Sequence, residues 1–174
     1  MKSLGFTLFE LLIVLLITSI LLAIAIPTFT EQIKNLQTKV AMHELLGAIE
    51  STRSLAVSTN KRAVLLANEG NWVNGWRLFI DLNDNGEING AETIKIERNK
   101  LTNVKVSANT HLQEYVSFIG TGEGRKVGQA NGGAIQIGTI KICPERKGDG
   151  YALIISRGGR TRVSNLTIAE CDEI

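Results

Sequence analysis

The sequence predicts an α+β protein, in which one long N-terminal helix packs on an antiparallel β-sheet head. Three observations predict this class. Residues 6–26 are almost entirely apolar, a helical period of apolar residues continues to residue 59, and short strand-like segments separated by Gly and Asn fill the rest. Runs of strands after one long helix are typical of α+β proteins.

The length and the charge of the chain set the limits for any function. The chain has 174 residues and a formal net charge of +2. This length suits an anchoring segment followed by one small domain with its own core. Because the overall charge is nearly balanced, nucleic-acid binding can be argued only from local clusters of basic residues.

The segment 6–26 has the composition of a membrane-crossing helix. Its 21 residues contain a single charged side chain, Glu10. About 20 apolar residues in a helix cross a hydrocarbon core of about 30 Å. A carboxylate in a membrane costs roughly 2.5–3.5 kcal/mol, which indicates that Glu10 has a partner or a function. A cleaved secretory signal is the alternative, with Lys2 before the apolar run and a small-residue cleavage site at 23–25.

The helical pattern continues over residues 27–59 as an amphipathic helix. Pro27 removes one helical hydrogen bond, which kinks or loosens the helix at that point. Beyond it, apolar residues recur at steps of three to five residues, as on one face of a helix. We expect the head to pack on this stripe, whose members are Phe29, Ile33, Leu36, Val40, Leu45, Ile49, Thr52 and Leu55.

The pattern of residues 60–174 is that of a β-rich head. Short alternating or β-branched segments recur about every ten residues with turn residues between them, which favours an antiparallel sheet. The glycine-rich segment 120–133 is interpreted as a mobile loop. The expected strands are 63–66, 75–80, 93–96, 104–106, 115–119, 134–143, 151–156 and 160–163.

The junction GFTLFELL at residues 5–12 resembles the leader junction of type IV pilins and type II secretion pseudopilins, with Phe9 in place of the usual Ile. The resemblance implies that a prepilin peptidase cuts after Gly5 and methylates the new amine of Phe6. It also implies that the Glu10 carboxylate neutralises the N-terminal amine of a neighbouring subunit as a filament forms. Two buried opposite charges are tolerable together and costly apart, which agrees with this role.

Over the head, the sequence resembles the GspH/FimT/FimU group of minor pilins. The resemblance rests on GWRLFIDLNDNG at 75–86, Ile-Cys at 142–143 and IISRGGRTR at 154–162. It implies a leader at 1–5, a transmembrane segment at 6–26, the amphipathic helix at 27–59 and a periplasmic head at 60–174. It further implies a single-pass inner-membrane protein that later enters a pilus or pseudopilus, with major and minor pilins and the prepilin peptidase as partners.

Cys143 and Cys171 are the only cysteines. A head outside the inner membrane lies in an oxidising compartment, so we expect a disulfide between them. In the chain-entropy model, closing a loop of this length stabilises the fold by about 3–4 kcal/mol. Two free thiols are the alternative. A metal site at the histidines is not expected, because His43 and His111 lie in separate segments.

An arginine-rich hairpin is the main candidate for a binding function. Gly158 and Gly159 predict a two-residue turn in which Arg157 faces Arg160, with Arg162 on the same face. Residues two apart on a strand are about 6–7 Å apart, similar to successive phosphates of a nucleic acid. No acidic residue lies between 150 and 169 to neutralise these arginines. The patch could extend to Arg125, Lys126, Lys141, Arg146 and Lys147 if the fold brings them near.

The string GRTR at 159–162 resembles the glycine-arginine-x-arginine motif associated with DNA binding in FimT-type pilins. This resemblance implies non-specific binding of double-stranded DNA for uptake in natural transformation. Two alternatives remain open. The hairpin can be a solvated edge of the sheet, or its arginines can contact acidic groups of a neighbouring pilin.

Two further patterns in the head have both a structural and a functional interpretation. Residues 81–92 fit a twelve-residue calcium loop, but their Asn, Asp and Gly content also suits a turn between two strands, which we favour. The calcium ligands would be Asp81, Asn83, Asn85, Glu87 and Glu92. The aromatic residues of the same hairpin would form either part of the core or an exposed platform for stacking bases; they are Trp72, Trp76 and Phe79.

The sequence contains no arrangement that supports catalysis. No Ser, His and Asp residues have usable spacing, and the glycines at 120–124 lack the lysine and helix start of a phosphate loop. We therefore expect no enzyme, no cofactor and no small-molecule substrate. The predicted function is that of a minor type IV pilin that supports pilus assembly and binds DNA. A minor pseudopilin of a type II secretion system without DNA binding is the alternative.

Overall fold

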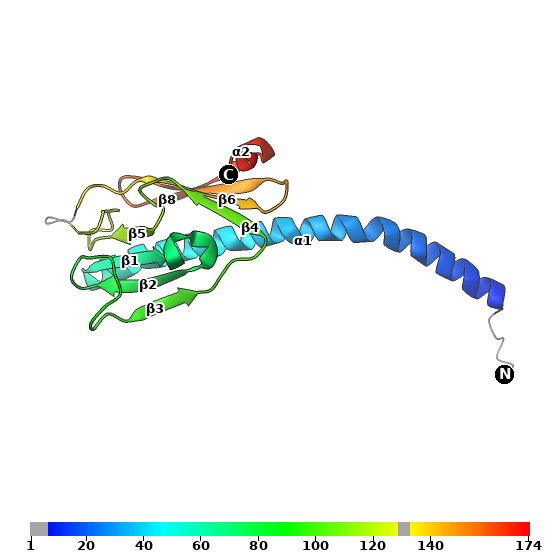
Figure 1. The fold of residues 1–174 in the computed structure, drawn as a ribbon, viewed down its shortest axis with the longest axis horizontal. Helices are drawn as coiled ribbons and strands as arrows, with labels where there is room; N and C mark the ends of the chain where they lie inside the picture. The colour runs from blue at the N-terminus through cyan, green and yellow to red at the C-terminus, as the bar shows by residue number, and fades with distance from the viewer. Residues whose placement is uncertain (1–6, 129–132) are drawn as a thin grey trace. The chain divides into compact units, whose positions relative to one another are not determined.

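The structure is a computed structural model that describes residues 7–128 and 133–174, apart from the side chains of residues 25–32, 34 and 35. Figure 1 shows its ribbon. The chain divides into two compact units, Met1–Lys34 and Asn35–Ile174. One long helix, α1 (Leu8–Thr59), begins in the first unit and ends in the second. The predicted long N-terminal helix is therefore confirmed.

In the first unit, α1 leaves its apolar side chains uncovered. The large apolar side chains between residues 8 and 24 are all exposed, by 41% to 78%. Among the helices of the described residues, none has both the length and the apolar composition that crossing a membrane requires. The predicted transmembrane segment 6–26 includes residues outside the described ones, as does the predicted leader 1–5.

In the second unit, one face of α1 is buried. The prediction of this face is correct for Leu45, Ile49 and Thr52, and wrong for Leu36 and Val40, which are 60% and 46% exposed. Ile33, in the first unit, is also exposed, and the Phe29 side chain lies outside the described residues. Alanines take up much of the buried face. Because their side chains are small, strands can approach the helix closely. Its buried residues are Thr38, Ala41, Met42, Leu45, Ala48, Ile49, Thr52 and Ala56.

Each of the eight predicted strand segments contains a strand, and the strands form two antiparallel sheets of four strands each. The first sheet has the order β3-β2-β1-β5. Its strands are β1 (Arg62–Ala67), β2 (Trp76–Asp81), β3 (Ile94–Arg98) and β5 (Tyr115–Phe118), with two short 3-10 helices, η1 (Asn68–Gly70) and η2 (Trp72–Asn74), between β1 and β2. The second sheet has the order β4-β6-β7-β8. Its strands are β4 (Val104–Ala108), β6 (Gly138–Pro144), β7 (Gly150–Ile155) and β8 (Thr161–Leu166).

One hydrophobic core joins α1 with both sheets. It contains Leu45 and Ile49 of the helix, Leu65 of the first sheet, and Ile140 and Leu153 of the second, all with no exposed surface. In Figure 1 the sheets lie one above the other at the left of the view, and α2 (Ile168–Asp172) lies beyond the upper one.

The three aromatic residues around β2 are buried. Trp72, Trp76 and Phe79 are 2%, 2% and 0% exposed, and the indole Nε1 of Trp72 donates a hydrogen bond of 2.8 Å to the Leu112 carbonyl oxygen. They therefore pack inside the head, as the core interpretation predicts. The alternative of an exposed stacking platform is wrong.

The glycine-rich segment 120–133 is more ordered than predicted in its described part. The backbone N–H of Arg125 donates to the Ser117 carbonyl at 3.0 Å, and that of Lys126 donates to the Ala134 carbonyl at 2.8 Å. The first bond pairs the segment after the turn with β5, and the second joins two parts of the glycine-rich segment and its continuation. Residues 129–132 of the predicted loop lie outside the described residues.

The predicted disulfide is confirmed, and it attaches the C-terminal segment to the second sheet. Cys143 of β6 is bonded to Cys171 of α2, with their Cα atoms 5.6 Å apart. A Cβ atom at Gly150 would lie only 2.7 Å from the Cys143 Sγ, so the disulfide packs directly on β7.

The short helix α2 was not predicted, although its capping signal is present in the sequence. Thr167 and Glu170 form a capping box, in which Glu170 Oε2 accepts hydrogen bonds from the Thr167 backbone N–H at 2.8 Å and hydroxyl at 2.9 Å. These bonds, the backbone one first, lower the pKa of Glu170 because they favour its ionised form.

Candidate functional site

Glu10 lies in the first turn of α1, beside the predicted processing site. Gly5 and Phe6 themselves lie outside the described residues. Glu10 Oε2 accepts hydrogen bonds from the backbone N–H and the hydroxyl of Thr7, both at 3.1 Å, and the Glu10 N–H donates to the Thr7 hydroxyl at 3.2 Å. The carboxylate is therefore held at the end of the helix where cleavage would create a new amine. We did not predict this capping box, although the Thr7-x-x-Glu10 spacing is its signal.

The arginine hairpin has a different turn from the one predicted. Arg157, Gly158 and Gly159 form a three-residue loop, because the Ser156 N–H donates to the Arg160 carbonyl at 2.9 Å and the Gly159 N–H donates to the Ser156 carbonyl at 2.9 Å. Gly159 has a left-handed φ of 74°, as is usual for the last residue of such a loop. Arg160 therefore lies opposite Ser156, and the prediction that Arg157 faces Arg160 is wrong.

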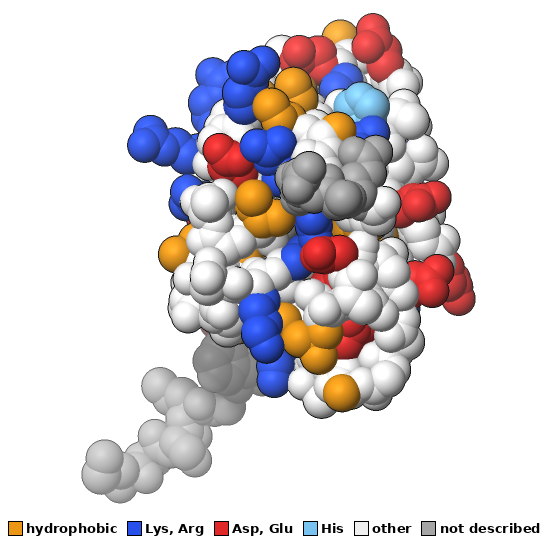
Figure 2. Space-filling model, turned by 90° about the vertical axis from the view of Figure 1, so that its left-hand side faces the viewer, with side chains coloured by type: hydrophobic (Ala, Val, Ile, Leu, Met, Phe, Trp, Pro, Cys, Tyr) orange, Lys and Arg blue, Asp and Glu red, His pale blue; other side chains and the backbone are white. Residues whose placement is uncertain are grey.

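The three arginines of the hairpin are all exposed. Arg157 lies in the loop, whereas Arg160 and Arg162 follow it two residues apart, which places them on one face of the strand about 6–7 Å apart. Among the described residues, no acidic group pairs with these arginines and no acceptor binds their guanidinium groups. Figure 2 shows this end of the head, where Lys and Arg side chains gather at the upper left. The hairpin thus offers positive charge that its own fold does not neutralise.

A close backbone contact fixes the hairpin loop against the turn that follows β5. A Cβ atom at Gly159 would collide with the Gly122 carbonyl oxygen and would lie 3.1 Å from the Phe118 ring. The same carbonyl oxygen accepts a hydrogen bond of 3.0 Å from Arg53 Nε of α1. Gly159 and Arg53 thus hold the arginine loop in a fixed position on the head. No local signal in the sequence marks either contact.

This packing makes Gly159 sensitive to substitution. We expect Gly159→Ala to lower the free energy of unfolding by about 1–3 kcal/mol, because alanine is strained at a left-handed φ and its methyl group collides with Gly122. Gly158→Ala is the matched control, since no atom lies within 4 Å of its Cβ position. Urea unfolding of the two variants measures the difference. Equal stabilities would contradict the described loop.

The fold brings few of the other predicted basic residues to this hairpin. Arg125 pairs with Glu123 at 2.7 Å. Arg146 and Lys147 lie in the turn between β6 and β7, at the opposite end of β7 from the arginine loop. Lys141 lies on β6, where it contributes to lowering the Glu170 pKa. The backbone N–H of Lys126 donates to the Ala134 carbonyl at 2.8 Å, and no described contact places Lys126 at the hairpin.

Most carboxylate and amide oxygens of the loop 81–92 accept hydrogen bonds from within the loop, whereas the Glu87 carboxylate accepts none among the described residues. Asp81 is 2% exposed and accepts hydrogen bonds from the backbone N–H groups of Asn85 and Gly86, at 3.2 and 2.9 Å. Glu92 accepts from the N–H groups of Leu82 and Asn89, at 2.7 and 3.1 Å. The side-chain oxygens of Asn83 and Asn85 likewise accept backbone N–H groups, the second from Glu87.

These contacts explain the composition of the loop without a bound ion. In the part of the chain that the structure describes, no three His, Cys, Asp or Glu side chains lie close enough together to hold a metal ion. The interpretation of 81–92 as a turn-rich loop, which we favour, and the calcium alternative both stay predictions.

Arg62 is a structural residue that the sequence did not reveal. Its side chain is 2% exposed and bonds to Asp84 at 2.7 Å, to the Ser117 hydroxyl at 2.7 Å and to the Arg125 carbonyl at 3.1 Å. It therefore ties the loop 81–92 and the segment after β5 to β1. In the sequence, a basic residue at the start of a strand looks like a solvated side chain, because its partners come from distant segments.

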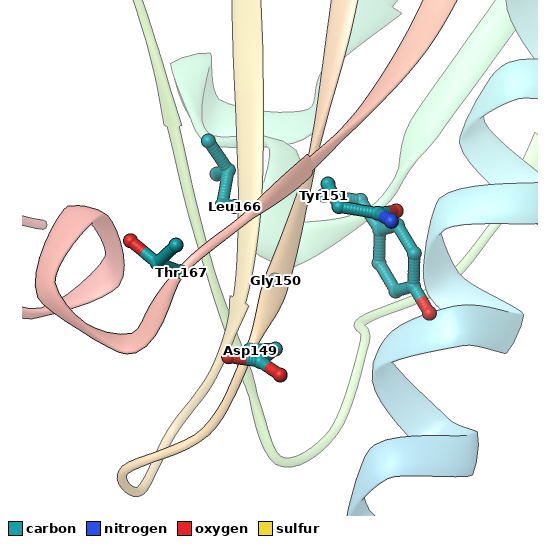
Figure 3. Close-up of a pocket in the computed structure, with 6 residues that line it drawn as sticks. Asp149, Gly150, Tyr151, Leu166 and Thr167 are labelled. Atoms are coloured by element: carbon teal, nitrogen blue, oxygen red, sulfur yellow. The ribbon is translucent and has the colours of Figure 1, made fainter.

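One surface pocket lies where β7 begins and β8 ends, lined by Asp149, Gly150, Tyr151, Asn165, Leu166 and Thr167. Figure 3 shows that Tyr151 points to one side of the sheet, and Leu166 and Thr167 to the other. Its side chains do not converge on one point, so the pocket has no arrangement suited to catalysis.

Comparison with solved structures defines the class of this fold. Two crystal structures of the Pseudomonas aeruginosa type IV minor pilin FimU are similar to the chain, each at 20% identity. The first has a TM-score of 0.59 and covers 78% of this chain and 92% of its own. The second has a TM-score of 0.56 and covers 72% and 91%. The chain therefore has the fold of a minor pilin.

The sequence matches two family models. Residues 1–26 match the prokaryotic N-terminal methylation motif, and residues 41–159 match the type II transport protein GspH. The chain belongs to the GspH family, and it is a structural protein of the type IV pilus and type II secretion group, not an enzyme. The methylation motif implies processing by a prepilin peptidase, inner-membrane anchoring and assembly with other pilins. Comparison with curated proteins gives no match.

Proposed function

We propose that this chain is a minor pilin of a type IV pilus, incorporated near the tip, which supports pilus assembly and binds double-stranded DNA for uptake in natural transformation. The mature chain begins with N-methylated Phe6, and residues 6–26 anchor it in the inner membrane with the head in the periplasm. The methylation motif and the uncovered apolar side chains of α1 support this anchoring role.

The observation that supports DNA binding is the uncompensated charge of the arginine hairpin. Arg157, Arg160 and Arg162 are exposed and have no acidic partner among the described residues. Backbone phosphates are the features of DNA that do not depend on sequence, and a guanidinium group binds them with a fixed set of donors. A pilus that captures DNA of any sequence needs such contacts. Several subunits or neighbouring pilins would act together to hold DNA during retraction.

The salt dependence of DNA binding tests this proposal. Three phosphate contacts predict a slope of about −2.7 in a plot of the logarithm of the binding constant against the logarithm of salt concentration. They also predict weak binding at physiological salt. Fluorescence anisotropy with DNA duplexes of unrelated sequence measures the slope and the sequence preference. A slope near zero, or strong preference for one sequence, would contradict binding through these three arginines.

The alternative is a minor pseudopilin of a type II secretion system, which the description of the matching family favours. The same anchor, methylation and head would serve a short periplasmic pseudopilus without DNA binding. The genes beside this one distinguish the two systems. Minor-pilin genes support the pilus, and secretion-apparatus genes support the pseudopilus.

A further inference from the structure

An asparagine followed by glycine is prone to spontaneous deamidation. The backbone nitrogen of the glycine can attack the asparagine side-chain carbonyl, because glycine has a permissive backbone and no side chain to obstruct the attack. The sequence contains four such pairs, at 74–75, 85–86, 89–90 and 131–132. The last pair lies outside the described residues, so the structure compares the other three.

Two of these three pairs are protected, because the glycine nitrogen that would attack is buried and bonded. Gly75 is buried, and its N–H donates to the Trp72 carbonyl oxygen at 3.1 Å. Gly86 is also buried, and its N–H donates to the Asp81 carboxylate at 2.9 Å. Asn85 itself is exposed, so the protection of this pair depends on its glycine.

The pair Asn89–Gly90 lacks this protection. Both residues are exposed, and no atom lies within 4 Å of the Cβ position of Gly90. The Gly90 N–H donates no hydrogen bond among the described residues. The Asn89 amide oxygen accepts one bond, of 3.1 Å, from Asn83 Nδ2, and Asn83 is exposed as well. The Asn89 side chain can therefore turn toward the Gly90 nitrogen after losing a single exposed contact.

We propose that Asn89 is a site of spontaneous deamidation in the folded head. The Gly90 nitrogen gives its proton to solvent and bonds to Asn89 Cγ. The Cγ–Nδ2 bond then breaks, and Nδ2 takes a proton from solvent and leaves as ammonia. Water opens the resulting cyclic imide at either carbonyl, which gives aspartate or isoaspartate. The conversion consumes one water and releases one ammonia, and nothing is oxidised or reduced.

The conversion changes a turn that helps to hold the loop 81–92. The Asn89 N–H donates to Glu92 Oε2 at 3.1 Å, and the Glu92 N–H donates to the Asn89 carbonyl oxygen at 3.1 Å. A carboxylate at position 89 adds a negative charge close to that of Glu92, and isoaspartate also lengthens the backbone by one carbon atom. Because the reaction needs no enzyme, older copies of the chain come to differ from new ones in the charge and geometry of this loop.

Peptide mapping of the aged full chain tests this proposal. Folded chain in detergent micelles is incubated at mildly alkaline pH, digested at low pH, and analysed by mass spectrometry with fragmentation that separates Asn85 from Asn89. We expect Asn89 to convert at least about tenfold faster than Asn85, because attack at Asn85 requires loss of a hydrogen bond to a charged acceptor. Anion-exchange chromatography should show a more acidic form of the chain that accumulates at the same rate.

The unfolded chain and two variants provide the controls. In guanidinium chloride, Asn74, Asn85 and Asn89 should convert at similar rates, because the protection of the first two is lost. Asn89→Gln should abolish conversion at this site, since glutamine would have to form a larger ring, whereas Asn85→Gln should leave it unchanged. The proposal is overturned if Asn89 converts only in the unfolded chain, or if Asn74 or Asn85 converts as fast as Asn89 in the folded one.

Discussion

Replacing Glu10 by Ala should leave the chain in the inner membrane and keep it out of the filament. In the assembled state we expect the Glu10 carboxylate to lie beside the N-terminal amine of a neighbouring Phe6, in apolar surroundings. Removing one member of a buried pair of opposite charges leaves the other uncompensated, which typically costs about 3–5 kcal/mol. The amount of this chain in sheared filaments, relative to its amount in membranes, measures the effect.

The variant Glu10→Gln separates charge from helix capping. In the single chain, Glu10 caps α1 through hydrogen bonds with Thr7. A glutamine oxygen can accept the same hydrogen bonds, but it carries no charge. We therefore expect Gln to fail in assembly nearly as completely as Ala. Normal assembly of the Gln variant would show that capping, and not neutralisation of an amine, is the role of Glu10.

The double variant Arg160→Gln/Arg162→Gln should lose most of the DNA binding of the head. Both side chains lie on one face of the hairpin, so the variant should lose two phosphate contacts. The slope of log K against log salt concentration should then become less negative by about 1.8. Affinity at low salt should fall by at least about tenfold, and transformation should fall with it. Electrophoretic mobility shifts and transformation frequency measure the two effects.

The matched control for this experiment is Arg146→Gln/Lys147→Gln. It removes the same charge from an exposed turn at the opposite end of β7. Binding should remain close to the wild-type level in this control. If the arginine double variant binds DNA normally, the assignment is wrong. If it loses pili as well as transformation, these arginines instead hold acidic groups of a neighbouring pilin.

Local patterns predicted most of the fold, because most of its elements depend on neighbouring residues. Apolar periodicity predicted α1, and alternation with intervening turn residues located all eight strands. The division into two sheets was not predicted, because it depends on which distant strands pair. β1, for example, pairs with β5 as well as with β2. The exposed positions of Leu36 and Val40 were missed because alanines, which give a weak apolar signal, take up the buried face of the helix.

The candidate sites show the same limit. The sequence placed Arg160 and Arg162 on one exposed hairpin, but it gave the wrong turn. Two adjacent glycines allow either a two-residue or a three-residue loop, and the hydrogen bonds of Ser156 with Arg160 and Gly159 show the three-residue form. Arg62 and Arg53 could not be identified as structural residues, because their partners come from distant segments of the chain.

Mass spectrometry of the mature protein tests the central claim most directly. A pilin of this group is cut by the prepilin peptidase after Gly5 and methylated at the new amine. The intact mass and the N-terminal peptide should therefore show N-methylated Phe6 as the first residue, with Glu10 retained as the fifth. A mature chain that begins at Ile26, or an uncut chain that begins at Met1, would contradict the assignment of this protein to a filament.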